Sequence, residues 1–184
     1  MTNLQEPQIY ISVAKPRDVY KTIIRDVFTM RVTQYKTILS NDGKAVLEKE
    51  VSFNRPDFDR QMNSPDKIVA FAKEVLRIHE NAEEYLYMIC MNNKLMMTSV
   101  FELSHGNVNS SIFGVREILQ KALLANAVSI IIMHNHPTGD PTPSAEDITV
   151  TKRLAEASKI VGVQLLDHLI IGRNYTSLKE RGDI

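Results

Sequence analysis

A β-branched apolar run that passes directly into a proline-rich loop and then an amphipathic helix limits the possible folds of this chain more than any other feature. Residues 128–133 read VSIIIM, and the β-branching of this short run predicts a buried central strand. The next stretch, HNHPTGDPTPS, contains three prolines, which keep the backbone out of a helix until Ser144. Residues 145–162, AEDITVTKRLAEASKIVG, are amphipathic and end in a glycine, as a helix commonly does. A buried strand, a stiff loop and a helix in this order predict a layered α/β arrangement.

Regular elements alternate along the rest of the chain, with hairpins among them. Strand patterns occupy residues 8–13, 84–91, 95–103 and 163–172, and a hairpin with an Asn-Asp-Gly turn occupies residues 33–53. Helical periodicity predicts helices over residues 16–28, 65–80 and 113–125. We therefore expect an α/β or mixed α+β fold in which helices flank a mixed sheet. The polar stretch NRPDFDRQMN suggests a boundary between an N-terminal extension (1–61) of unknown function and a main domain (62–184).

Composition narrows the function classes. The 184 residues include 22 basic and 22 acidic side chains, so no overall positive field attracts nucleic acid, although a local basic patch is not excluded. Cys90 is the only cysteine, which excludes an intrachain disulfide and a Cys₂His₂ zinc site. The N-terminus does not resemble a signal peptide, and every apolar run is shorter than the ~20 residues that span a bilayer. We expect a cytoplasmic protein without membrane association.

The loop after the central strand carries residues suited to binding a metal ion. His134 and His136 are two residues apart, so in an extended backbone both imidazoles point to the same side. Ser144 is a candidate N-cap and Asp147 follows three residues later, which places both on one helical face turned back toward the histidines. Two imidazoles and one carboxylate leave a fourth position for water, as in catalytic zinc sites. Such a metal lowers the pKa of its water to about 7 and also needs a nearby general base.

Simpler interpretations exist for each half of this pattern. Two histidines in a polar loop are common, and Ser-x-x-Asp is close to a capping box whose role can be only to start a helix. The combination favours a metal site, and capping by Ser144 is compatible with ligation by Asp147. Two other motif interpretations fail. The HNH nucleases disperse their residues over a long ββα unit, and the zinc deaminases need a Pro-Cys-x-x-Cys segment that a chain with one cysteine lacks.

The spacing His134-x-His136, seven residues, Ser144, two residues, Asp147 resembles the H-x-H-x₇-S-x₂-D motif of the JAMM metalloproteases of the JAB/MPN superfamily. The flanking segments, ALLANAVSIII before the motif and LLDHLIIG after it, resemble the RadC branch over roughly residues 62–184 and weakly upstream through the hairpin. This resemblance implies a cytidine-deaminase-like, JAMM-type mixed sheet. It implies that the two histidines and the aspartate bind Zn²⁺, and that Ser144 stabilises an oxyanion.

The resemblance also implies an upstream glutamate that acts as general base at the start of the first strand of the domain. Alignment of that strand with YLYMICMN favours Glu84, with Glu83 as the alternative. The implied function is zinc-dependent hydrolysis of a peptide or isopeptide bond in a protein or peptide substrate. The alternative is a DNA-repair-associated or partner-binding RadC-type protein whose metal site is structural or vestigial. The balanced charge argues mildly against DNA, and the upstream helix-hairpin-helix segment of full-length RadC proteins is not recognisable.

Other polar residues invite weaker interpretations. Asp167 and His168 follow an apolar run and match a recurring Asp-His pair of the RadC branch, for which hydrogen bonding is favoured over metal ligation. His105 lies in a loop and either lines the cleft or is merely exposed. His79 is expected at a helix C-terminus, where its charge suits the helix dipole. Cys90 is expected to be a small buried apolar residue in mid-strand.

Overall fold

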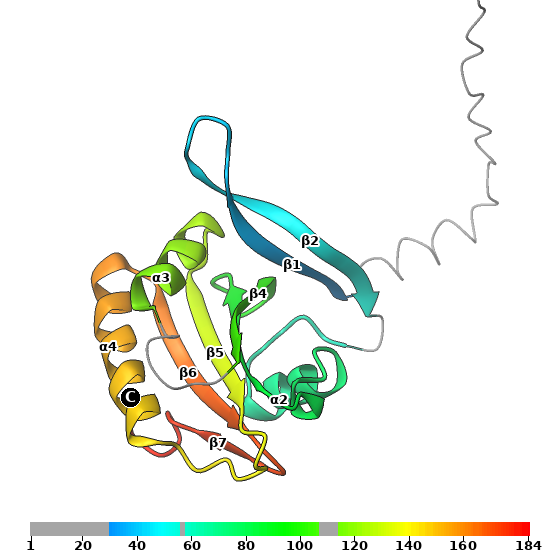
Figure 1. Cartoon of the computed structure of the whole chain (residues 1–184), viewed down its shortest axis with the longest axis vertical. Coiled ribbons are helices and arrows are strands. Elements are labelled where there is room, and N and C mark those ends of the chain that lie inside the picture. The colour runs from blue at the N-terminus through cyan, green and yellow to red at the C-terminus, as the bar shows by residue number, and fades with distance from the viewer. Residues whose placement is uncertain (1–29, 56–57, 107–113) are drawn as a thin grey trace, which may run out of the picture.

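The computed structural model describes residues 30–55, 58–106 and 114–184 (Figure 1). The described strands are β1 (Met30–Leu39), β2 (Ala45–Arg55), β3 (Glu84–Met91), β4 (Met97–Gly106), β5 (Ser129–Asn135), β6 (Gln164–Ile171) and β7 (Tyr175–Ser177). The described helices are α2 (Pro65–Glu74), the short 3₁₀ helix η1 (Ile78–Glu80), α3 (Val115–Leu124) and α4 (Ala145–Val161). None of these helices is long and apolar enough to cross a membrane. The strand predicted at 8–13 and the helix predicted at 16–28 lie outside the described residues.

The strands form one mixed sheet in the order β2-β1-β4-β3-β5-β6-β7. The β1–β4 and β5–β6 pairs are parallel, and the remaining neighbours are antiparallel. Helix α2 packs on one face, where Phe71, Ile89 and Met133 belong to one apolar core. Helices α3 and α4 cover the other face, where Ile118, Leu154 and Ile132 belong to a second core. The predicted fold class, a mixed sheet flanked by helices, is confirmed.

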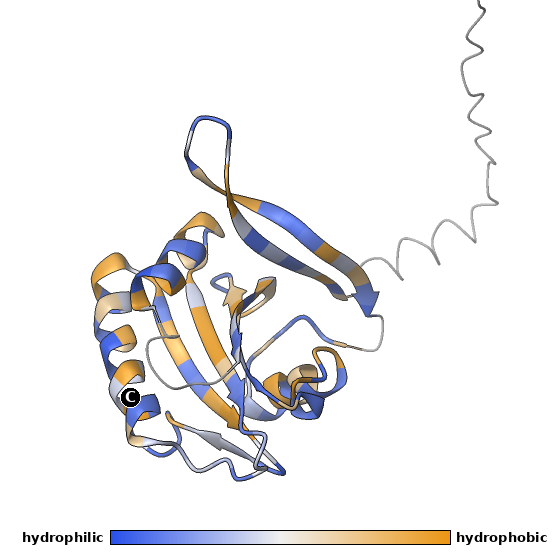
Figure 2. Cartoon of the chain, viewed as in Figure 1, coloured by the Kyte–Doolittle hydropathy of each residue, from blue (hydrophilic) through white to orange (hydrophobic). Residues whose placement is uncertain are grey.

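Strand β5 is the predicted central strand, and every one of its residues is buried. It lies between β3 and β6 and is coloured largely as apolar in Figure 2. Burial on both faces explains why residues 130–133 are all apolar rather than alternating with polar residues, because each of these side chains meets a helix-covered core. The strand therefore provides a rigid base for the residues at its C-terminal end.

The prediction of one helix over residues 65–80 is wrong at its C-terminal end. Helix α2 begins after the Ser64 N-cap as expected but ends at Glu74, although the apolar pattern continues through Val75 and Leu76. Arg77 has φ 53° in the left-handed region, which turns the chain out of the helix and buries Ile78 completely. His79 consequently lies in η1 rather than at the end of a long helix. The turn leads the chain directly to the start of β3.

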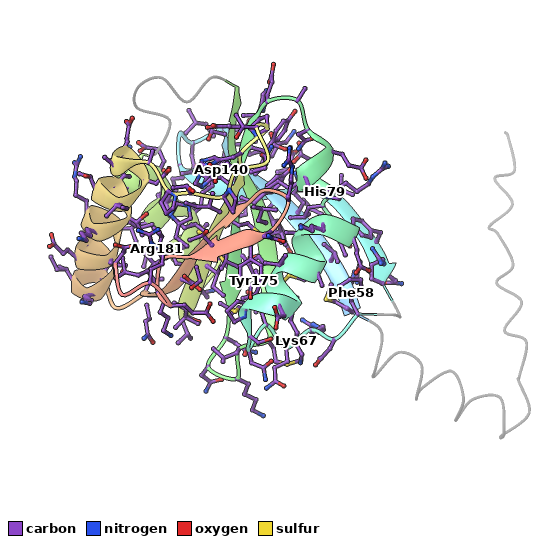
Figure 3. All side chains as sticks on the ribbon, turned by 90° about the horizontal axis from the view of Figure 1, so that it is seen from below. Phe58, Lys67, His79, Asp140, Tyr175 and Arg181 are labelled. Carbon is purple, nitrogen blue, oxygen red and sulfur yellow. The ribbon has the colours of Figure 1, made fainter. Side chains whose placement is uncertain are left out.

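The two edges of the sheet are built differently. The β1–β2 hairpin has its predicted turn at residues 41–43 and joins the sheet through parallel pairing of Gln34 with Val100 on β4. It thus shares one sheet with strands of the segment 62–184. At the opposite edge, the three-residue β7 was not predicted from the sequence. The Tyr175 hydroxyl donates a hydrogen bond of 2.9 Å to Asp66 at the start of α2, on the side seen in Figure 3.

Three chain segments meet at one end of the sheet. Because β3 runs antiparallel to β5, the start of β3 lies beside the end of β5, where Leu86 pairs with His134. The loop 136–144 then leads into α4, which begins close to both strands, because Asp147 lies 3.5 Å from His134 and lines one cavity with His134 and Glu84. The candidate site is formed where these three segments meet: the start of β3, the end of β5 and the start of α4.

Candidate metal centre

His134 and His136 lie where the extended backbone predicts, on the α4 side of the sheet. His134 is the penultimate residue of β5 and only 5% exposed, and His136 follows the last residue of that strand. The His136 amide donates to the carbonyl of Ile171, so the backbone stays attached to β6 beyond the end of β5. Continued pairing keeps the two-residue periodicity and turns both imidazoles to one side. Their Nε2 atoms are 3.0 Å apart.

Ser144 and Asp147 form the predicted N-terminus of α4. The Ser144 hydroxyl accepts a hydrogen bond from the Asp147 amide at 3.1 Å, and the Ser144 amide donates to the Asp147 carboxylate at 2.8 Å. This reciprocal capping box satisfies two amides that the first helical turn leaves free. The Ser144 hydroxyl also donates to Asp147 Oδ2 at 2.6 Å. The cap therefore holds the carboxylate at the start of the helix, facing the histidines.

The three side chains form a cluster that could hold a metal ion. One ligand atom from each of His134, His136 and Asp147 lies within 4.8 Å of the other two. The Asp147 carboxylate is 3.5 Å from His134 Nε2 and 3.8 Å from His136 Nε2. Burial lowers the pKa of His134 to about 4, so its imidazole is neutral at physiological pH, as a metal ligand must be.

The hydrogen bond of His136 defines its tautomer. Its Nδ1 lies 2.8 Å from the carbonyl oxygen of Asp140, in the loop seen in Figure 3. A carbonyl only accepts, so Nδ1 carries the hydrogen and donates it. In the neutral ring, Nε2 then has a free lone pair that faces His134 and Asp147.

A buried hydrogen-bond chain defines the tautomer of His134 in the same way. The Thr151 hydroxyl donates to the Asp147 carbonyl at 2.5 Å and must therefore accept from His168 Nδ1, which lies 2.7 Å away. Burial holds the pKa of His168 well below its usual value, so this ring is neutral and its Nε2 is an acceptor. His134 Nδ1, 2.8 Å from that atom, then donates to it. His134 Nε2 is left with a lone pair directed at the cluster.

Asp167 and His168 lie in the middle of β6 and make hydrogen bonds that hold this strand in place, and neither belongs to the cluster of His134, His136 and Asp147. The Asp167 carboxylate accepts from the His168 amide at 2.7 Å, the Ser177 hydroxyl at 2.6 Å and the Lys179 amide at 3.1 Å. It thereby ties β6 to β7 and to the turn that follows. The His168 side chain lies on the α4 side of the sheet, where it contacts His134. The hydrogen-bonding interpretation of this pair agrees with the geometry.

Glu84 lies in a cleft beside the cluster. It is half-buried as the first residue of β3 and lines a cavity of about 630 Å³ together with His134 and Asp147. Burial raises the pKa of its carboxyl, the charge of Asp147 raises it further, and His136 opposes the rise. Glu83, the alternative base, is exposed and does not line the cleft. The roles of Glu84 and Ser144 in a reaction stay predictions.

The remaining sequence-based candidates lie away from the cluster. His105 is exposed, stacks on Tyr85 and lies 2.8 Å from Glu102, and it does not line the cleft. Cys90 is fully buried, and burial raises the pKa of its thiol to about 12, so it is a core residue as expected. His79 lies in η1 beside Glu80.

Two residues with contacts at the site were missed from the sequence. Thr151 follows Asp147 by four residues, and this spacing on one helical face could have identified it. Asn135 lies between the two histidines, and its side chain is buried against the segment before β3. Nothing in the local pattern indicates a partner some fifty positions upstream.

Comparison with known proteins agrees with this geometry. The sequence profile of the RadC-like JAB domain matches residues 62–183. A UPF0758 protein of Clostridium acetobutylicum is 46% identical over 123 residues, which cover 66% of this chain and 53% of the relative. A UPF0758 protein of Clostridium novyi is 47% identical over 121 residues, 65% of this chain and 52% of the relative. One from Clostridium botulinum is 50% identical over 103 residues, 55% of this chain and 45% of the relative.

The chain spans about half the length of the curated relatives it matches. The profile match covers the cleft, the three clustered side chains and every strand from β3 to β7. The chain therefore belongs to the RadC-like JAB domain family.

Proposed function

We propose that this protein is a zinc-dependent hydrolase that cleaves a peptide or isopeptide bond in a cytoplasmic protein or peptide substrate. One observation carries the proposal: two imidazole nitrogens with lone pairs and one carboxylate converge at the wall of a cleft that also contains Glu84. Membership of the RadC-like JAB domain family supports it.

The donor set suits a zinc ion. The two Nε2 atoms are both acceptors by the hydrogen bonds of their Nδ1 atoms, yet they lie 3.0 Å apart. Two facing lone pairs at this distance repel each other unless a proton or a metal ion lies between them. Ligands about 2.0–2.1 Å from a tetrahedral zinc are separated by about 3.3 Å. The two Nε2 atoms are 3.0 Å apart, His134 Nε2 lies 3.5 Å from Asp147 Oδ1, and His136 Nε2 lies 3.8 Å from Asp147 Oδ2, so the three side chains are near the spacing that such an ion needs. Three protein ligands leave one position for water or substrate.

A zinc ion bound here would supply a Lewis acid that polarises the substrate carbonyl and lowers the pKa of water. Glu84 accepts a proton from the attacking water and returns it to the leaving nitrogen. In the metal-free cleft burial raises the pKa of this carboxyl, and a general base works best when its pKa lies near the working pH. The Ser144 hydroxyl turns from Asp147 Oδ2 toward the developing oxyanion and stabilises it by a hydrogen bond.

The decisive experiment compares neighbouring glutamates. The zinc-loaded chain is screened against a pool of fluorogenic peptides and lysine-isopeptide-linked peptides, and the best substrate is used for Glu84→Gln and Glu83→Gln. We expect Glu84→Gln to keep its zinc and to lose turnover by at least about 100-fold, because a positioned general base contributes about 10²–10⁴. Glu83→Gln is the matched control and retains turnover.

Turnover in Glu84→Gln equal to that of the wild type would contradict the proposed mechanism. A salt-dependent shift of duplex DNA by the chain, unchanged when zinc is removed, would instead favour the DNA-associated alternative.

A further inference from the structure

Asn135 connects the metal cluster to the backbone of Glu84. Its side-chain oxygen accepts a hydrogen bond from the Tyr85 amide at 2.7 Å. Its side-chain nitrogen donates to the Glu83 carbonyl at 2.9 Å and, at 3.5 Å, to the Asn81 carbonyl. Asn135 itself is 2% exposed, so its side of these contacts is buried. The two shorter hydrogen bonds, to the Tyr85 amide and the Glu83 carbonyl, hold the main-chain groups on either side of Glu84.

The side chain of Asn135 extends a strand pairing that the backbone cannot continue. Main-chain pairing of β3 with β5 ends where Leu86 meets His134. Beyond that point the His136 amide is bonded to Ile171 on the other side, so β5 follows β6. The Asn135 amide group takes the place of a peptide unit, since it offers one acceptor and a donor in the same plane. The start of β3 is thereby held at Tyr85, one residue before Leu86, where the backbone pairing with β5 ends.

We propose that Asn135 is a positioning residue that holds Glu84 beside the metal cluster. This inference rests on the proposed role of Glu84 as general base. Asn135 lies between two of the three clustered residues, so one short segment, 134–136, carries the histidines and also fixes the base. Any displacement of β5 therefore moves the histidines and Glu84 together.

The residue type matters because both halves of the amide are used. Alanine at position 135 would leave the Tyr85 amide and the Glu83 carbonyl without this partner. Aspartate has nearly the same shape but only accepts when ionised, so one oxygen would face the Glu83 carbonyl and repel it. Misplacement of a catalytic group by about 1 Å can lower a rate by about 100-fold.

The test combines a structural and a kinetic measurement on zinc-loaded Asn135→Ala and Asn135→Asp. Hydrogen exchange by NMR reports the Tyr85 amide directly, and the Met88 amide in the middle of β3 is the internal reference. We expect exchange at Tyr85 to accelerate about tenfold or more in Asn135→Ala, with Met88 unchanged and zinc content as in the wild type. With the best peptide from the screen above, kcat should fall about 10–100-fold while KM changes less than about threefold.

A matched control accounts for general loss of stability. Ser158→Ala removes a buried hydroxyl that donates to Ala155 near the far end of α4, and it should leave Tyr85 exchange and kcat unchanged. Equal acceleration at Tyr85 and Met88 in Asn135→Ala, or unchanged kcat despite a released Tyr85 amide, would overturn the positioning role. If Asn135→Asp has the Tyr85 exchange rate and the kcat of the wild type, the side-chain N–H donor of Asn135 is not needed. Failure of the proposed function is distinguishable, because Glu84→Gln would then itself have no effect.

Discussion

The β1–β2 hairpin and the β5–α4 unit belong to one sheet but use polar side chains in opposite ways. The hairpin carries exposed pairs such as Lys36–Glu48, whose side chains are half exposed, and it leaves Leu39 75% exposed. The β5–α4 unit, together with the neighbouring β6, buries His134, His168 and Thr151 in one hydrogen-bonded chain. An exposed ion pair adds little to the stability of the fold, because its charges are well solvated without it. A buried polar group, in contrast, costs free energy unless it is hydrogen-bonded.

This difference indicates where the molecule tolerates change. The hairpin lies before the segment that matches the family profile, and every residue of β2 is exposed or half-buried. The buried chain runs from the core to the cluster of His134, His136 and Asp147, so its geometry is transmitted to the side chains that could hold a metal ion. We therefore expect substitutions at exposed positions of the hairpin to have small effects and substitutions along the buried chain to alter both stability and metal binding.

The largest expected effect contrasts two leucines. Leu154 on α4 is fully buried, and Leu154→Ala should lower the free energy of unfolding by about 2–5 kcal/mol because it leaves a cavity. Leu39→Ala at the hairpin end should change it by less than about 0.5 kcal/mol. Urea denaturation of both variants measures the contrast. Equal losses would mean that the hairpin end is buried in solution.

The next effect concerns metal affinity. Thr151→Val keeps the shape of the side chain but removes the hydroxyl that orients His168, and we expect zinc affinity to fall about 10–100-fold. The zinc affinity of His168→Ala should fall by the same factor or by more. His105→Ala, which changes an exposed residue, should bind zinc as the wild type does. Competition with a chelator measures all three. Unchanged affinity in Thr151→Val would show that the buried chain does not orient His134.

Stability of the metal-free protein should depend on pH. His134 has a folded-state pKa of about 4, below its ordinary value of 6.5, so the unfolded chain binds the extra proton first as pH falls. The stability due to neutral His134 is complete above about pH 6.5 and is lost toward pH 4, by about 1.4 kcal/mol per pH unit. Denaturation across this range measures the slope, and His134→Gln should reduce it. If His134→Gln leaves the slope unchanged, the pH dependence of stability comes from other groups.

The smallest effect is expected in the hairpin. Lys36→Ala removes an exposed ion pair with Glu48, and the thermal midpoint should stay within about 2 °C of the wild type. Zinc content should not change. A shift of several degrees by differential scanning calorimetry would show that the hairpin edge contributes more to the fold than its exposure suggests.

Local signals predicted most of the described fold. The β-branched run of β5 and the Asn-Asp-Gly turn mark their elements by intrinsic preference, and Ser144 marks the start of α4 by its side-chain chemistry. The end of α2 could not be predicted, because the apolar pattern continues while tertiary packing of Ile78 decides where the chain turns. β7 has three residues and depends on its partners in β6.

The candidate site divides in the same way. His134, His136 and Asp147 could be predicted to converge, since strand and helix periodicity fix their directions within one short segment. The contacts of Asn135 and His168 join strands that are distant in sequence, and only the register of the sheet reveals them. Long-range pairing therefore supplies what local periodicity cannot.

The most direct test of the central claim is the zinc content of the chain purified without added metal. Mass spectrometry of metals should find close to one zinc per wild-type chain and less than about one tenth of that in His134→Ala and His136→Ala, because two remaining ligands bind zinc weakly. The matched control is His105→Ala, which should contain zinc as the wild type does. Zinc retained at wild-type level in both ligand variants would contradict the metal centre.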